Sequence, residues 1–130
     1  MAAPGRKVAG VPSRIFETGE VIFRQGDAGP REAYLVHQGR VEVRRRILDQ
    51  DRALRLLGTG ELLGEVALFG DAPHSATAVA LERSVLLVVA AERLESLVRG
   101  SPDLALAIIR QLARMASAEH SRPRPRGGRR

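Results

Sequence analysis

The stretch LGTGELLGEVALFGDAPHSATAVA, residues 57–80, is the most informative part of the sequence. Gly64 allows close approach of the backbone, and a short helical stretch is expected over residues 65–69. The first amides of such a helix have no partner inside it, and with the helix dipole they favour a phosphate in front of them. The carboxylate of Glu65 is also suited to accept a hydrogen bond from a sugar hydroxyl.

A tight turn follows this helix and brings the chain back. Residues 70–73, Gly-Asp-Ala-Pro, deliver His74, Ser75 and Thr77 opposite the helix start. Taken alone, a Gly-Glu pair before an apolar helical turn is also typical of a half-buried connecting helix. His74 is equally compatible with an ordinary surface loop, and Thr77 with a β-branched residue that opens a strand.

Short β-rich stretches separated by glycines lie on both sides of this segment. They are residues 15–16, 21–23, 34–36, 41–43, 54–57, 77–81 and 85–89. Gln38-Gly39 separates two of them like a hairpin turn. Short strands at this spacing predict a β-sandwich or a β-barrel.

The hydrophobic period changes to that of a helix in the last third of the chain. A helix is expected over residues 91–99 and ended by Gly100, and a second over residues 102–120 with Ser101 as its N-cap. The apolar stripe of the second helix comprises Leu104, Ile108, Leu112 and Met115. This stripe must cover either the domain's own sheet or a second copy of the chain.

Composition narrows the class of protein. The 130 residues, 44% of them hydrophobic, suffice for one domain, and with no cysteine there is neither a disulfide framework nor a thiolate site. No apolar run approaches the roughly 20 residues of a membrane span, and no secretory signal is evident, so we expect no membrane contact and a cytoplasmic location. The three histidines, His37, His74 and His120, are too far apart in sequence to suggest a metal site.

Charge is unevenly distributed along the chain. Without the five arginines among residues 121–130, the net charge falls from +6 to +1, which argues against a nucleic-acid-binding face on the folded part. We expect residues 1–13 to be a flexible lead-in, residues 14–120 to form the domain, and residues 121–130 to be a disordered basic tail. The tail could touch phosphates or acidic partners, or simply be solvated.

The central segment resembles the phosphate-binding cassette of the cyclic nucleotide-binding family. That cassette has the pattern Gly-Glu-x-Ala-Leu, a short turn, then Pro-Arg-x-Ala-Ser/Thr; here residues 64–68 are Gly-Glu-Val-Ala-Leu and residues 73–77 are Pro-His-Ser-Ala-Thr. Residues 19–27 and 34–43 look like the family's early strands, so the resemblance covers about residues 14–120. It implies a mainly β fold, a double-stranded β-helix or jelly-roll-like β-roll of eight strands, with a cassette helix and two C-terminal helices.

The resemblance also implies a ligand and the residues that hold it. Cyclic AMP or cyclic GMP would bind without a metal, with Glu65 on the ribose 2′-hydroxyl and with Gly64 and Ser75 on the phosphate. The remaining cassette positions are Val66, Ala67, Ala76 and Thr77. His74 departs from the family, which places there an arginine that pairs with the cyclic phosphate. Histidine offers at most two N–H groups and is mostly neutral at pH 7, so this contact is weakened.

Three functions follow as hypotheses. The first is a stand-alone, non-enzymatic cyclic nucleotide sensor that signals to a protein partner, or to a second copy, through its C-terminal helix. The second is an interaction module of the same fold that has lost nucleotide binding. The third is an electrostatic nucleic-acid binder that acts through the tail; sequence-specific DNA binding is not expected, because no segment suggests a recognition helix.

Overall fold

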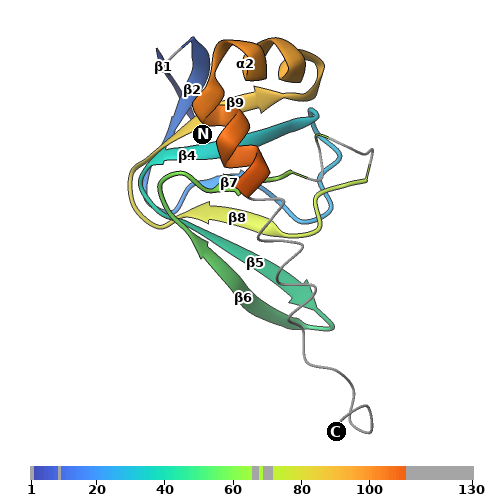
Figure 1. Ribbon diagram of the computed structural model, residues 1–130. Coiled ribbons are helices and arrows are strands. Elements are labelled where there is room, and N and C mark those ends of the chain that lie inside the picture. Colours follow the sequence, from blue (N-terminus) through green and yellow to red (C-terminus); the bar gives the residue numbers. More distant parts are fainter. Residues whose placement is uncertain (1, 9, 66–67, 69–71, 111–130) are drawn as a thin grey trace, which may run out of the picture.

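Two antiparallel β-sheets form the body of the protein in the computed structural model, which describes residues 2–8, 10–65, 68 and 72–110 (Figure 1). One sheet has the strand order β1-β2-β9-β4-β7 and the other the order β3-β8-β5-β6. The strands are β1 (Ala3–Val8), β2 (Val11–Phe16), β3 (Val21–Phe23), β4 (Glu32–Gln38), β5 (Val41–Ile47), β6 (Gln50–Leu57), β7 (Leu62–Leu63), β8 (Thr77–Ala80) and β9 (Ser84–Ala90). The predicted mainly β fold with C-terminal helices is confirmed.

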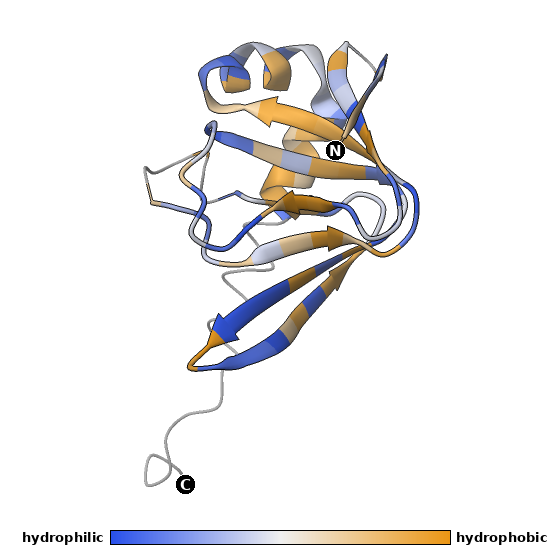
Figure 2. Ribbon diagram, turned by 180° about the vertical axis from the view of Figure 1, so that it is seen from behind, coloured by the Kyte–Doolittle hydropathy of each residue, from blue (hydrophilic) through white to orange (hydrophobic). Residues whose placement is uncertain are grey.

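The space between the two sheets is filled by apolar side chains from both. Alternate residues of the strands point into it, as the period of two requires. Its buried members are Phe16, Phe23, Tyr34, Val36, Val41, Val43, Leu57, Leu63, Ala76, Ala78, Ala80, Leu86 and Val88. Figure 2 shows that β9 is apolar along most of its length, whereas β5 and β6 become hydrophilic toward the turn that joins them.

The C-terminal helices cover the outer face of the five-stranded sheet. A 3₁₀ turn, η1 (Ala91–Arg93), leads into α2 (Leu94–Gly100), and residues 102–110 form a further helix. The predicted N-cap is confirmed, because the Leu104 amide donates to Ser101 Oγ at 3.3 Å. Leu104 and Ile108 are 1% and 8% exposed and pack in a second core against this sheet. The apolar stripe was predicted to cover either the domain's own sheet or a second copy of the chain. Leu104 and Ile108 pack on the domain's own sheet.

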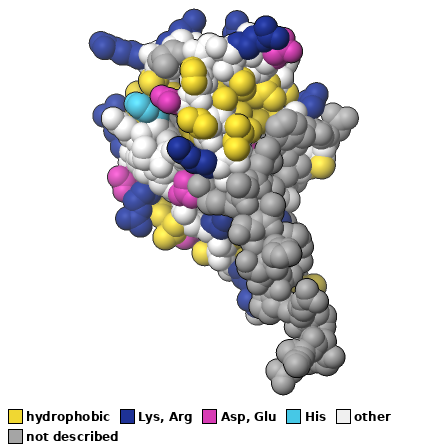
Figure 3. Space-filling model, in the orientation of Figure 1, with side chains coloured by type: hydrophobic (Ala, Val, Ile, Leu, Met, Phe, Trp, Pro, Cys, Tyr) yellow, Lys and Arg dark blue, Asp and Glu magenta, His cyan; other side chains and the backbone are white. Residues whose placement is uncertain are grey.

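Apolar side chains also gather on the exposed side of these helices (Figure 3). Leu106 and Ile109, on the helix of residues 102–110, are 46% and 60% exposed. They lie on the opposite side of the helix from Leu104 and Ile108. Leu112 and Met115 of the predicted stripe lie outside the described residues.

The hairpin between β4 and β5 turns at Gly39. This residue has φ +108°, a conformation that side-chain-bearing residues rarely adopt, and a Cβ added to it would lie 2.6 Å from Ser84 Cα. Ser84 is fully buried, and its Oγ accepts a hydrogen bond from the Arg40 amide at 3.2 Å. The turn is thereby fixed to the start of β9.

The expectation that residues 1–13 are a flexible lead-in is wrong for the described part of this segment. β1 pairs with β2 in an antiparallel hairpin that turns at Gly10, with Val8 opposite Val11 and Gly5 opposite Ser13. β1 is an edge strand and is mostly exposed, so its sequence lacks the alternation that identifies half-buried strands. The two-residue strand β7 was also not predicted.

The remaining expectations about the ends of the chain stay predictions. The end of the domain at residue 120 and the basic tail of residues 121–130 lie outside the described residues. Within the part that is described, no helix is long and apolar enough to cross a membrane.

Candidate functional site

Five of the predicted site residues surround one small cavity. They are Gly64, Glu65, His74, Ser75 and Ala76, and the wall also includes Phe23, Val43, Arg55, Leu63, Ala72 and Pro73. The cavity has a volume of about 70 Å³. Ligand pockets usually measure about 300–1,000 Å³, so the part of this cavity that the described residues line is small.

Gly64 brings the cassette backbone close to the core. Its φ is +75°, and a Cβ at this position would lie 3.2 Å from Phe23 Cε2 and 3.4 Å from the Glu32 carbonyl oxygen. Gly64 thus lets the backbone approach the core closely, and its predicted contact with a phosphate stays a prediction. The next residue, Glu65, is half-buried, and its carbonyl oxygen accepts a hydrogen bond from the Leu68 amide at 3.0 Å, which closes one turn.

His74 forms much of one wall. Its ring lies flat on Phe23, with ring centroids 3.8 Å apart and an interplanar angle of 9°. Phe23 in turn stacks on Tyr34 at 6.2 Å, so the histidine continues an aromatic row out of the inter-sheet core. The His74 amide donates to the Asp27 carbonyl at 2.9 Å, and the Gly26 amide donates to the His74 carbonyl at 2.8 Å. His74 is therefore part of an ordered wall and not a free loop residue.

This environment lowers the pKa of His74. Burial against the aromatic ring penalises the imidazolium, and the nearby charge of Asp27 opposes this effect only in part. The ring is thus predominantly neutral at neutral pH. A neutral ring stacked on Phe23 is a weak substitute for the arginine expected at this position.

The three residues after His74 occupy different structural positions. The Ser75 carbonyl accepts a hydrogen bond from Arg45 Nε at 2.9 Å, and its side chain is exposed at the cavity. Ala76 is buried between the sheets. Thr77 opens β8, and its Oγ1 accepts a hydrogen bond from the Gln25 amide at 2.9 Å. Thr77 does not line the cavity, and its position matches the strand-opening role weighed from the sequence.

Two further wall residues matter and were missed in the sequence. Phe23 contacts the positions of both Gly64 and His74, and Arg55 is a positively charged residue in the lining of the cavity. The alternation of side chains along the short strands is the signal that could have identified them. Phe23 is the buried last residue of β3, and Arg55 lies on the same face of β6 as the buried Leu57.

Two predicted site residues, Val66 and Ala67, lie outside the described residues. Among the residues that are described, no three His, Asp or Glu side chains are grouped so that they could hold a metal ion.

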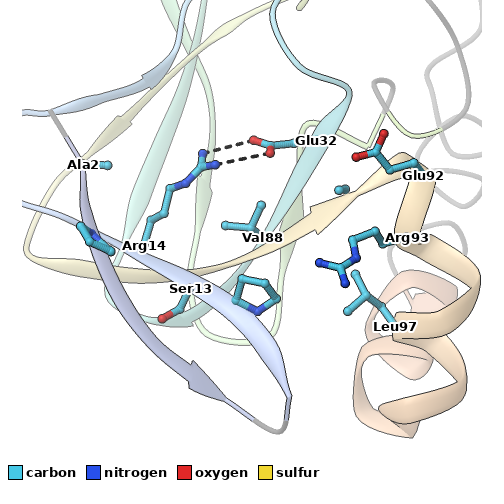
Figure 4. A pocket seen from close by; sticks show the side chains of 11 residues that line it. Ala2, Ser13, Arg14, Glu32, Val88, Glu92, Arg93 and Leu97 are labelled. Atoms are coloured by element: carbon cyan, nitrogen blue, oxygen red, sulfur yellow. Dashed lines mark hydrogen bonds and ion pairs between the residues drawn. The ribbon is translucent and has the colours of Figure 1, made fainter.

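A larger cavity of about 410 Å³ lies between the β1–β2 edge and the helices, away from the cassette (Figure 4). Arg14 points across it to Glu32, with Arg14 Nη1 and Glu32 Oε1 3.2 Å apart, and also donates to the Tyr34 hydroxyl at 3.2 Å. Burial, and then the charge of Glu32, raises the pKa of Tyr34 to about 12. Because Arg14 already has these partners, it does not offer a free cation to an anionic ligand.

The sequence and the cassette geometry agree with one family. The model of the cyclic nucleotide-binding domain matches residues 13–101. The chain belongs to this family. The resemblance seen in the sequence is thereby confirmed.

Relatives of this cyclic nucleotide-binding domain have known structures. The cyclic AMP receptor protein of Thermus thermophilus is 42% identical over 102 residues, which are 78% of this chain and 47% of that protein. The crystal structure of the catabolite activator protein of Thermus thermophilus superposes with a TM-score of 0.71 at 39% identity, covering 83% of this chain and 51% of that one. The cyclic AMP-bound form of the EAL enzyme Bd1971 gives a TM-score of 0.60 at 29% identity and covers 83% and 29% of the two chains. The domain thus spans less than half the length of the receptor protein.

Proposed function

We propose that this domain is a regulatory, non-catalytic sensor that binds cyclic AMP or cyclic GMP in the cavity beside His74. The observation that carries the proposal is the meeting of Gly64, Glu65, His74 and Ser75 around that one cavity. These residues come from two segments that flank the cassette turn, and they supply a ribose acceptor and polar groups for a phosphate. Structures of similar domains with bound cyclic AMP and cyclic GMP support this choice of ligand.

We expect nucleotide binding to change the position of the His74 ring. The ring lies on Phe23 in a cavity of about 70 Å³, which is smaller than most ligand pockets. A phosphate near Ser75 attracts a protonated imidazole, so the ligand favours a charged ring that leaves the apolar face of Phe23. Ligand entry and movement of this ring are therefore coupled.

The signal would leave the domain through its C-terminal helices. Leu68, in the cassette, is buried in the same core as Leu104 and Ile108. A shift of the cassette would therefore reach the helix of residues 102–110 through this shared core. The exposed Leu106 and Ile109 offer this helix an apolar surface for a protein partner or a second copy.

A second candidate function is an interaction module that has lost nucleotide binding. The stack of His74 on Phe23 and the absence of an arginine at this position favour it. Isothermal titration calorimetry with cyclic AMP and cyclic GMP separates the two candidates. If the domain is a sensor, the parent protein binds saturably and Glu65→Ala greatly weakens the binding. If it is an interaction module, neither the parent nor the variant gives a heat of binding.

A further inference from the structure

Arg55 lies on the inner face of the four-stranded sheet. Along β6, Leu57 is buried between the sheets and Leu56 is 56% exposed, so alternation returns Arg55 to the side of Leu57. Its partner across the ladder is Val43, which is also buried in the inter-sheet core. A position in line with two apolar core residues thus carries a guanidinium.

Arg55 is one of the residues that line the cavity beside His74. Arg55 shares its wall with Glu65, His74 and Ser75. Other arginines of the β5–β6 hairpin have protein partners: Arg44 lies 3.2 Å from Glu42, Arg45 donates to the Ser75 carbonyl, and Arg52 donates to Gln50.

Within the described part of the chain, the side chain of Arg55 has neither a hydrogen bond nor an ion pair with another residue; its backbone lies in the ladder opposite Val43. Its side chain is exposed. It is therefore available to a ligand.

We propose that Arg55 contacts the bound nucleotide and supplies the planar, permanently charged fork that His74 lacks. This inference rests on the proposed function. A guanidinium carries five donors and no acceptor, and it binds groups that present two acceptors side by side. A cyclic nucleotide has such pairs in the phosphate oxygens and, for guanine, in O6 and N7; adenine presents a donor beside N7 instead.

The test compares Arg55→Leu with Arg52→Leu by calorimetric titration of the full chain with cyclic AMP and cyclic GMP. Both changes remove one arginine from β6, but Arg52 does not line the cavity. We expect Arg55→Leu to weaken binding by roughly tenfold or more, because hydrogen bonds to charged groups contribute about 1.5–3 kcal/mol and about 1.4 kcal/mol corresponds to tenfold. Arg52→Leu should bind like the parent protein.

The two ligands identify the acceptor. An equal loss for both ligands assigns Arg55 to the phosphate, and a loss confined largely to cyclic GMP assigns it to the guanine edge. Arg55→Gln, which keeps a polar side chain on the strand, serves if the leucine variant does not fold. If the Arg55 variants bind both ligands as tightly as the parent does, the inference is wrong while the proposed function stands. If the parent itself binds neither ligand, the proposed function fails and this inference fails with it.

Discussion

Under the proposed function, we expect His74 to determine how well the cavity accepts a phosphate, because it stands where the family pattern has an arginine and it lies on Phe23. Its main-chain groups are held by Gly26 and Asp27, so a longer side chain at this position still starts from the cavity wall. We predict that His74→Arg tightens cyclic nucleotide binding by about 1.5–3 kcal/mol at neutral pH, since it restores a charged bidentate donor. Calorimetric titration of both proteins measures this difference.

The two proteins should also differ in their response to pH. The pKa of His74 is lowered in the free protein, and a bound phosphate raises it, so binding takes up a proton. Parent affinity should therefore increase as the pH falls from about 8 to about 6, while the arginine variant stays nearly constant. Equal affinities without pH dependence would mean that His74 does not face the phosphate.

The same residue makes stability depend on pH in the absence of ligand. The folded pKa of His74 lies below its unfolded value of about 6.5, so the unfolded chain binds the proton more tightly. The contribution of neutral His74 to the free energy of unfolding is fully present above the unfolded pKa. It is lost as the pH falls through the lowered pKa of the folded protein. We predict that His74→Phe, which keeps an aromatic ring on Phe23, loses less stability than the parent between about pH 8 and about pH 5. Urea unfolding at both pH values measures this, and identical losses in the two proteins would exclude the histidine as the cause.

At the level of secondary-structure elements, the β4–β5 hairpin depends on Gly39. A side chain there needs an unfavourable φ of +108° and collides with the backbone of Ser84. We predict that Gly39→Ala lowers the free energy of unfolding by about 2–4 kcal/mol, the combined scale of left-handed backbone strain and overpacking. Gly29→Ala is the matched control, because a Cβ at Gly29 meets nothing within 4 Å and Gly29 does not have a positive φ. Chemical denaturation showing equal losses for both variants would contradict the assignment.

The helix of residues 102–110 has two apolar faces with different duties. Leu104 is buried against the sheet, while Leu106 and Ile109 are exposed. We predict that the double variant Leu106→Ser, Ile109→Ser changes stability by less than about 1 kcal/mol but weakens any self-association, whereas Leu104→Ala costs about 2–5 kcal/mol of stability. Thermal unfolding and sedimentation velocity measure the two effects. If the parent associates and the double variant associates equally, the exposed face of Leu106 and Ile109 is not the contact between the copies.

The elements that the sequence predicted are those with strong local signals. The strand of residues 21–23 was predicted with the bounds of β3, and Ser101 was recognised as an N-cap from its position before Pro102. β1 was missed because an exposed edge strand needs no apolar alternation, and its pairing with β2 is a long-range property. The motif predicted the candidate site residues, and their role stays a prediction. The stack of His74 on Phe23 was not predicted, since 51 positions separate the two residues in sequence. Arg55 was also missed, because it lies outside the motif and only the fold brings it to the cavity beside His74.

On the scale of the whole molecule, the two cores connect the cavity beside His74 with the C-terminal helices. The core between the sheets contains Phe23 and Ala76, which line the cavity. The second core, between the five-stranded sheet and the helices, contains Leu68 and Leu104. A ligand that moves the cassette therefore acts on both cores. Under the proposed function, this arrangement would convert ligand binding into a change at the helical surface of the domain.

The central claim is that a cyclic nucleotide binds beside His74, and an NMR titration of the ¹⁵N-labelled chain tests it most directly. With cyclic AMP or cyclic GMP added to saturation, we predict the largest amide shifts at Gly26, Gly64 and Ser75, with smaller shifts along the helix of residues 102–110. The noncyclic 5′-AMP is the control and should cause weaker changes. The absence of shifts with either cyclic nucleotide, or shifts confined to Ser13 and Arg93 at the larger cavity, would contradict the account.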